Sequence, residues 1–228
     1  MELGRRYEMR KRLLYVVQGI SKDNYLTKDL IEKSALPTKK YDEIILAPTE
    51  RMFDQALRGS FLRYIPKSDK YGDFLTFYLS EWVRKKVCRS VRNQYKKLKK
   101  EYDQIDILAH SLGTVIVMSS GEEDQFIEAD RAIMIGSPLG FKRWSNLGLL
   151  SRWSNKHLRK YMSFSCRTMY YGWSKEDKVS NRYTNGIEKT LNHGDIKRIV
   201  PFQSKSDHSW KQYLADWTKQ FLSVFDRK

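Results

Sequence analysis

The chain has 228 residues, of which 40% are hydrophobic, and it carries a formal net charge of +16. This length and hydrophobic content fit one folded domain over residues 1–228. Two cysteines, Cys88 and Cys166, are too few for a disulfide framework and show no metal-ligand spacing. No apolar run is long enough for a signal-peptide core or a membrane span, so we expect a cytoplasmic protein. We also expect no cofactor and no metal.

Short apolar segments alternate with helical patterns along the chain. The expected strands cover residues 13–18, 43–48, 105–109, 132–136, 167–172 and 196–202. The expected helices cover residues 27–34, about 73–102, a segment directly after residue 111, and 209–225. This alternation favours a doubly wound, mostly parallel α/β sheet of about six strands with helices on both faces.

The segment Ala109-His110-Ser111-Leu112-Gly113 joins the third expected strand to the following helix. Small residues two positions before and two positions after Ser111 allow a sharp turn that exposes the serine hydroxyl. The helix would direct its first backbone N–H groups towards an oxyanion formed at this serine. The pattern predicts a nucleophile elbow that cleaves an ester, thioester or amide. The alternative is a serine in an ordinary strand-to-helix turn.

Through this segment the chain resembles the α/β-hydrolase superfamily, in particular its small lipase-like and esterase-like members with a His-Ser-x-Gly elbow. Ala109 replaces the usual first glycine and is small enough for the close approach of strand and helix. Relatives usually begin with two extra antiparallel strands, so we expect a short version of the fold here. The resemblance implies a catalytic triad in the chain order nucleophile, acid, histidine.

The acid of that triad is expected in the loop after the strand at residues 167–172. Asp177 matches the superfamily's position because it comes shortly before Val179. A buried carboxylate is needed there to orient the imidazole and stabilise it when it is charged. Glu176 and Asp195 are the alternative acids. Asp177 would otherwise be a solvated acid of the loop with no catalytic role.

The general base is expected between the last strand and the closing helix, where His208 stands. The chain contains four histidines. His110 is expected to be a structural residue of the elbow, and His157 a surface residue of a basic stretch. His193 precedes the last strand and is the alternative base.

The oxyanion hole needs a second backbone donor besides the N–H of Leu112. Gln18-Gly19 follows the first expected strand, at the place where relatives carry a His-Gly pair. The second donor is therefore expected to be the N–H of Ile20, or that of Ser21 if the loop is shifted by one residue. A generic strand-ending glycine is the alternative.

Two further segments resemble the superfamily without a predicted catalytic role. Residues 136–140 (Gly-Ser-Pro-Leu-Gly) match a loop that borders the pocket in relatives, although glycine and proline there are explained by a turn. Residues 141–166 carry apolar side chains near helical spacing between basic residues. They are expected to form a lid over an acyl pocket or, equally, a helix packed on the sheet.

The run from Arg84 to Lys100 contains nine basic residues and no acidic residue. Apolar residues at three-to-four spacing place these charges on the exposed face of a helix. Such a face attracts an anionic membrane or another polyanion, and a solvated helix face is the alternative. No nucleic-acid module is recognised, so nucleic-acid binding is not expected as the main function.

Together these patterns predict a serine hydrolase acting on a small-molecule or lipid carboxylic ester through an acyl-enzyme. An acyltransferase with the same triad is the nearest alternative, because water exclusion decides which acceptor takes the acyl group. A binding protein on a hydrolase scaffold, docked through residues 84–100, is the alternative from another class.

Overall fold

The computed structural model describes residues 10–19, 27–34, 36–57, 77, 80–121, 127–140, 164–180, 183, 188, 191 and 195–225. The strands are β1 (Arg12–Gln18), β2 (Glu43–Leu46), β3 (Gln104–His110), β4 (Ile127–Ile135), β5 (Phe164–Ser174), β6 (Asp195–Ile196) and β7 (Ile199–Ser204). The helices are α1 (Lys28–Glu32), α2 (Thr49–Leu57), α4 (Glu81–Glu101), α5 (Leu112–Met118) and α8 (Trp210–Phe225). Short 3-10 turns lie at Thr38–Lys40 and Pro138–Gly140.

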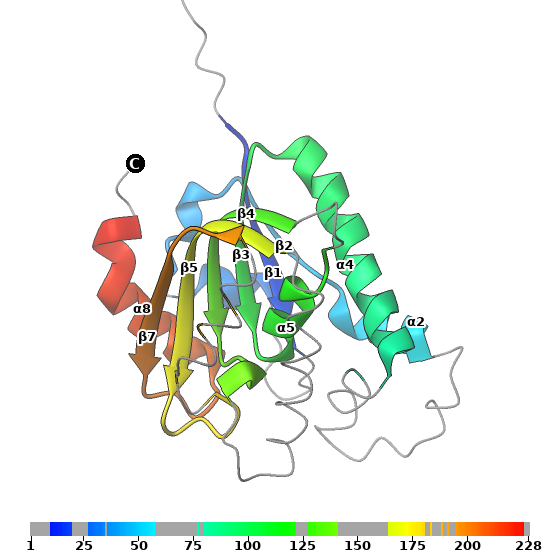
Figure 1. Cartoon of the computed structure of the whole chain (residues 1–228). Coiled ribbons are helices and arrows are strands. Elements are labelled where there is room, and N and C mark those ends of the chain that lie inside the picture. The colour runs from blue at the N-terminus through cyan, green and yellow to red at the C-terminus, as the bar shows by residue number, and fades with distance from the viewer. Residues whose placement is uncertain are drawn as a thin grey trace, which may run out of the picture.

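The strands form one sheet in the order β2, β1, β3, β4, β5, with β6 and β7 both paired to β5 (Figure 1). All pairings between the described strands are parallel. The register joins Gln18 to His110, His110 to Ile135, Ile135 to Gly172 and Gly172 to Phe202. The carboxyl ends of five strands therefore lie at one edge of the sheet. The predicted doubly wound, parallel α/β sheet is confirmed.

Helices cover both faces of the sheet because the strands are apolar on both sides. Along β1, Leu13, Tyr15 and Val17 contribute to the core beneath α2, α4 and α5, whereas Leu14 and Val16 contribute to the core beneath α1 and α8. Successive side chains of a strand point to opposite faces, so one short apolar run supplies both cores. Figure 1 shows α4 and α8 on opposite sides of the strands.

The expected last strand at residues 196–202 is divided into β6 and β7. The N–H of Lys197 donates to the carbonyl of Cys166, and the N–H of Met169 donates to the carbonyl of Arg198. Pairing with β5 therefore continues across the division without a change of register. The two segments act as one edge strand.

Helix α4 begins at Glu81 and not near residue 73 as expected. Ser80 has an extended backbone, and its Oγ accepts the N–H of Val83, which is the geometry of an N-cap. Residues 73–76, 78 and 79 of the expected helix lie outside the described residues. Helix α2 was not expected, and its Met52, Phe53 and Ala56 are buried in the core shared with α4.

Candidate active site

The elbow around Ser111 follows β3 directly and has a strained backbone. Ser111 has φ 55° and ψ −131°, a combination that side-chain-bearing residues rarely adopt. A Cβ atom at Gly113 would lie 2.1 Å from the carbonyl oxygen of Val17, so only glycine allows α5 to approach β1 this closely. The N–H of Ser111 donates to the carbonyl of Ile135 at 3.0 Å. The end of β4 thus helps to hold the turn that carries the serine.

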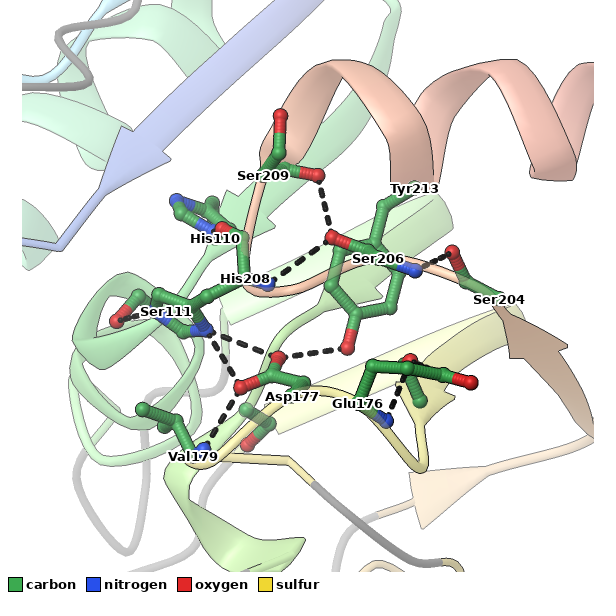
Figure 2. A network of polar contacts seen from close by, with 12 residues as sticks. His110, Ser111, Glu176, Asp177, Val179, Ser204, Ser206, His208, Ser209 and Tyr213 are labelled. Atoms are coloured by element: carbon green, nitrogen blue, oxygen red, sulfur yellow. Dashed lines mark hydrogen bonds and ion pairs between the residues drawn. The ribbon is translucent and has the colours of Figure 1, made fainter.

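Ser111, His208 and Asp177 come from three loops and form a hydrogen-bonded row (Figure 2). Ser111 Oγ lies 3.0 Å from His208 Nε2. His208 Nδ1 lies 2.9 Å from Asp177 Oδ2 and 3.1 Å from Oδ1. The loops follow β3, β5 and β7, whose carboxyl ends share one edge of the sheet. The three residues predicted as nucleophile, acid and base are therefore brought together, and their catalytic roles stay predictions.

The carboxylate of Asp177 is fully buried and accepts hydrogen bonds from several donors. Besides His208, Tyr213 OH donates to Oδ2 at 2.7 Å, and the N–H of Val179 donates to Oδ1 at 2.7 Å. Burial raises the pKa of Asp177, but hydrogen bonds and charge from His208, followed by the bonds from Tyr213 and Val179, outweigh it. The pKa of Asp177 therefore lies below its ordinary value, and the group is an anion at neutral pH.

His208 reaches the site from a loop with an unusual backbone. Its φ is 103°, which is rare for a residue other than glycine. The imidazole lies against Gly136, where a Cβ atom would be 3.2 Å from both Cε1 and Nδ1 of the ring. Gly136 itself has φ 60°. The glycine after β4 therefore provides both the turn and the space for the ring of His208.

The alternative acids are not in contact with His208 in the described structure. Glu176 is exposed, and its carboxylate accepts a hydrogen bond from Ser174 Oγ at 2.7 Å. Asp195 is exposed and lies in the short strand β6. The alternative base, His193, lies outside the described residues, as does His157.

Of the two predicted oxyanion donors, the structure describes one. Leu112 is the first residue of α5, directly after the serine, whereas Ile20 and Ser21 lie outside the described residues. Gly19 N–H donates to the carbonyl of His110 at 2.8 Å. A Cβ atom at Gly19 would come within 2.6 Å of the Leu112 nitrogen. The glycine after β1 therefore leaves the approach to this N–H open.

The sequence patterns did not predict three contacts at the site, although His110 was expected in the elbow and residues 136–140 at the border of the pocket. Tyr213 hydrogen-bonds Asp177, Gly136 lies against His208, and His110 bonds the backbone of His208. Tyr213 lies five residues after His208 on the amphipathic helix α8, where an aromatic residue is expected to be core. Its hydroxyl is the one available signal, because buried tyrosines need a hydrogen-bond partner.

The structure describes only a small part of the predicted lid and gives no sign of a metal site or a membrane span among the described residues. Residues 141–163 of the predicted lid lie outside the described residues, and residues 164–166 begin β5. Among the described residues, no group of three or more His, Cys, Asp or Glu side chains could hold a metal ion. None of the described helices is long and apolar enough to cross a membrane.

Helix α4 presents the predicted basic face to the surface. Val83, Val87, Val91, Tyr95 and Leu98 are buried towards the sheet. The opposite side carries the exposed residues Trp82, Lys85, Lys86, Arg89, Asn93, Lys96, Lys97, Lys99 and Lys100, which we call the α4 basic face. The Lys86 ammonium lies 3.8 Å from the centre of the Trp82 ring. Arg92 departs from the expected pattern because it is buried.

No protein-family model and no curated protein matches the chain in sequence. Solved structures match its fold. One of two metagenome-derived lipolytic enzymes has 9% sequence identity and a TM-score of 0.52, with 96% of this chain and 95% of that chain covered. A structure from Lactobacillus plantarum WCFS1, solved as a candidate cell-surface hydrolase, has 14% identity and a TM-score of 0.51, with 94% and 92% covered.

An acylaminoacyl peptidase also matches, with 15% identity and a TM-score of 0.51. This chain is covered completely, whereas 38% of the peptidase is covered. The chain therefore has the α/β-hydrolase fold, and the fold implied by the resemblance is confirmed. Because these neighbours include a lipolytic enzyme and a peptidase, the fold leaves the choice of substrate to the site.

Proposed function

We propose that the protein is a serine hydrolase that cleaves carboxylic esters, with Ser111 as nucleophile, His208 as general base and acid, and Asp177 as the orienting acid. The observation that carries this proposal is the hydrogen-bonded row from Ser111 Oγ through His208 to Asp177, with steps of 3.0 and 2.9 Å. A serine hydroxyl is a weak nucleophile until a base within hydrogen-bond reach accepts its proton. The row supplies that base and its carboxylate partner.

In the acylation step, Ser111 Oγ attacks the ester carbonyl carbon while its proton moves to His208 Nε2. The new C–O bond forms as the carbonyl electron pair moves to oxygen and gives an oxyanion. Asp177, whose pKa is held below its ordinary value, stabilises the resulting imidazolium. The intermediate then collapses, the bond to the leaving oxygen breaks, and His208 returns the proton to the alcohol.

The oxyanion is stabilised by the backbone N–H of Leu112 and, as the second proposed donor, by that of Ile20. The close approach of Gly19 to the Leu112 nitrogen supports this proposal, because a larger residue there would obstruct the donor. The acyl-enzyme is finally hydrolysed by water, which His208 activates in the same way. An acceptor alcohol in place of water would make the enzyme an acyltransferase.

Labelling with a fluorophosphonate tests the proposal, because such reagents bond covalently to a serine activated by a base. We expect the wild type to be labelled at Ser111 and the Ser111→Ala variant to be unlabelled. p-Nitrophenyl esters of increasing chain length, with phospholipid and thioester substrates alongside, then define the acyl group. Absence of both labelling and turnover in the wild type would favour a binding protein on a hydrolase scaffold.

The α4 basic face supports a second role, attachment to an anionic lipid surface. An exposed tryptophan within a row of lysine and arginine side chains is suited to the boundary between headgroups and water. The first turn of α4, which contains Trp82, lies at the end of the molecule to which the strands point (Figure 1). Docking through this face would bring the site close to lipid esters.

Vesicles that contain anionic phospholipid, compared with purely zwitterionic vesicles, test this role. Reversal of Lys85, Lys86, Arg89 and Lys96 to Glu should weaken binding and reduce its salt dependence, while turnover of a small neutral ester stays unchanged. For a matched change of charge, the Lys86→Glu/Arg89→Glu pair is compared with Lys211→Glu/Lys219→Glu on α8. Equal binding by both pairs, or a preference for RNA over vesicles, would contradict the lipid role.

A further inference from the structure

The backbone of His208 is held by side chains on both of its polar groups. Its N–H donates to Ser206 Oγ at 3.1 Å, and its carbonyl oxygen lies 3.1 Å from His110 Nε2. Ser206 Oγ in turn donates to the carbonyl of Ser209 at 2.8 Å. Because the φ of 103° at His208 is unfavourable by itself, these contacts are what maintain the conformation that directs the imidazole towards Ser111.

His110 is the unusual member of this set, because it is a buried histidine. It is the last residue of β3, its exposed fraction is 2%, and its ring centre lies 4.9 Å from that of His208 (Figure 2). Burial, and next the neighbouring His208, lower the pKa of His110 to about 3. His110 is therefore neutral at pH 5 and above and carries one ring proton.

The partner atom fixes where that proton lies. A carbonyl oxygen only accepts hydrogen bonds, so the proton must be on Nε2 of His110. Nδ1 of His110 has no hydrogen-bond partner among the residues that the structure describes. The bond to His208 is therefore the ring's single hydrogen bond within this part of the chain. A neutral ring also places no second positive charge beside His208 when His208 accepts the proton of Ser111.

We propose that His110 is a positioning residue for the base: its Nε2–H donates to the carbonyl of His208 and holds the imidazole in line with Ser111 Oγ. This inference rests on the proposed serine-hydrolase function. His110 and Ser111 are adjacent in the chain, so one short segment sets both the nucleophile and the backbone of its base.

Two substitutions of similar size separate the donor from the bulk of the ring. His110→Gln keeps an N–H near the position of Nε2, whereas His110→Leu fills the space without a donor. We expect His110→Leu to lower kcat on a short ester by about 10- to 100-fold with KM nearly unchanged, since misplacement of a catalytic group acts on the reacting geometry. His110→Gln should recover most of the lost kcat. A purely structural role would not be rescued by the donor alone.

Nitrogen NMR of histidine-labelled protein gives a second readout that does not need activity. In the wild type, His110 should show a protonated Nε2 and an unprotonated Nδ1 between pH 5 and 9. The proton shared by His208 Nδ1 and Asp177 should be shifted or broadened in His110→Leu and retained in His110→Gln. A wild-type protein inert to fluorophosphonates would refute the proposed function, while these spectra still decide the positioning role.

The proposal is overturned by any of three results. The first is a wild-type His110 protonated on Nδ1, which requires no variant to fold. The second is a folded His110→Leu variant with wild-type kcat and an unchanged His208 resonance. The third is a folded His110→Gln variant as impaired as His110→Leu, because the retained N–H would then have no effect.

Discussion

Two buried aspartates of this protein are opposites in their chemistry. Asp177 and Asp106 have exposed fractions of 0% and 2%, yet the pKa of Asp177 is lowered and that of Asp106 is raised. At Asp177 the effect of burial is outweighed by His208, by the Tyr213 hydroxyl at 2.7 Å and by the Val179 N–H at 2.7 Å. These donors stabilise the charged form more than burial destabilises it.

At Asp106, in the first half of β3, burial is the dominant effect. The Arg131 Nε lies 3.9 Å away, and Tyr41 OH donates to Oδ2 at 2.8 Å. Both lower the pKa of Asp106 without overcoming the loss of solvation. Burial of a carboxyl group is therefore no sign of a catalytic site. The number of short, well-directed donors decides whether the group stays an anion that can support an imidazolium.

The largest expected difference between the two regions is in activity. Ser111→Ala and His208→Ala should each lower kcat/KM on any ester substrate by about 10,000-fold or more, because the members of a triad act as a unit. The double variant should be little worse than either single one. Steady-state kinetics and thermal unfolding of the same preparations would separate lost chemistry from lost folding.

Asp106→Asn and His193→Ala are the matched controls and should both keep near wild-type activity. An essential His193 and a dispensable His208 would contradict the assignment of His208 as the base. A Ser111→Ala variant that retains more than about 1% of wild-type turnover would contradict the assignment of Ser111 as the nucleophile, since the expected loss is far greater.

Asp177→Asn should cost less than loss of Ser111 or His208 but still about 1,000-fold in kcat/KM. The amide can hold the imidazole in the wrong tautomer, and it does not stabilise the imidazolium. Glu176→Gln is the control, because Glu176 is exposed and bonds Ser174 instead of His208. If Asp177→Asn is fully active and Glu176→Gln or Asp195→Asn is inactive, the residue changed in the inactive variant is the acid of the triad.

Tyr213→Phe should make Asp177 more like Asp106 by removing one donor. Loss of a hydrogen bond to a charged group should raise the pKa of Asp177 towards its ordinary value. It should also lower kcat about three- to tenfold, which is part of the about 1.5 to 3 kcal/mol that a hydrogen bond to a charged group contributes. Carbon NMR titration of the carboxyl group would measure the first effect and kinetics the second. An unchanged pKa of Asp177 in this variant would mean that Tyr213 does not stabilise the Asp177 anion.

The smallest expected effect is on stability and has opposite signs in the two regions. The raised pKa of Asp106 favours the folded state below about pH 3.9, and that contribution is lost as pH rises through the raised value. The lowered pKa of Asp177 gives a contribution present above about pH 3.9 and lost as pH falls through the lowered value. Urea unfolding of the two Asn variants against wild type from pH 3 to 7 should show opposite slopes. Slopes of the same sign would contradict the pKa direction of the aspartate whose slope has the wrong sign.

The sequence predicted the features that depend on local patterns. Apolar segments indicated the strands, and small residues around Ser111 indicated the elbow. Chain order, taken from the resemblance, selected Asp177 and His208. The start of α4 and the division between β6 and β7 differed from expectation, because a single cap at Ser80 and the pairing with β5 determine them.

The contacts around the predicted residues needed the folded chain. His110, Tyr213 and Gly136 contact residues that are 36 to 98 positions away in the sequence and that the fold brings close. Histidine, tyrosine and glycine occur just as often in a protein core without any role at a site, so their residue types give no signal. A pattern in one sequence therefore predicts the candidate nucleophile, acid and base but not which neighbours orient them.

The strained backbone of Ser111 has a consequence for the evolution and engineering of this protein. A residue with a side chain held at φ 55° and ψ −131° costs about 1 to 3 kcal/mol, so the elbow opposes folding while it presents the hydroxyl. Ser111→Gly would relieve that strain, whereas Ser111→Ala would keep it. The glycine variant should therefore unfold at a higher temperature than the alanine variant. The difference between them, corrected for the greater conformational entropy that glycine gives the unfolded chain, would measure how much stability the protein gives up to expose one serine.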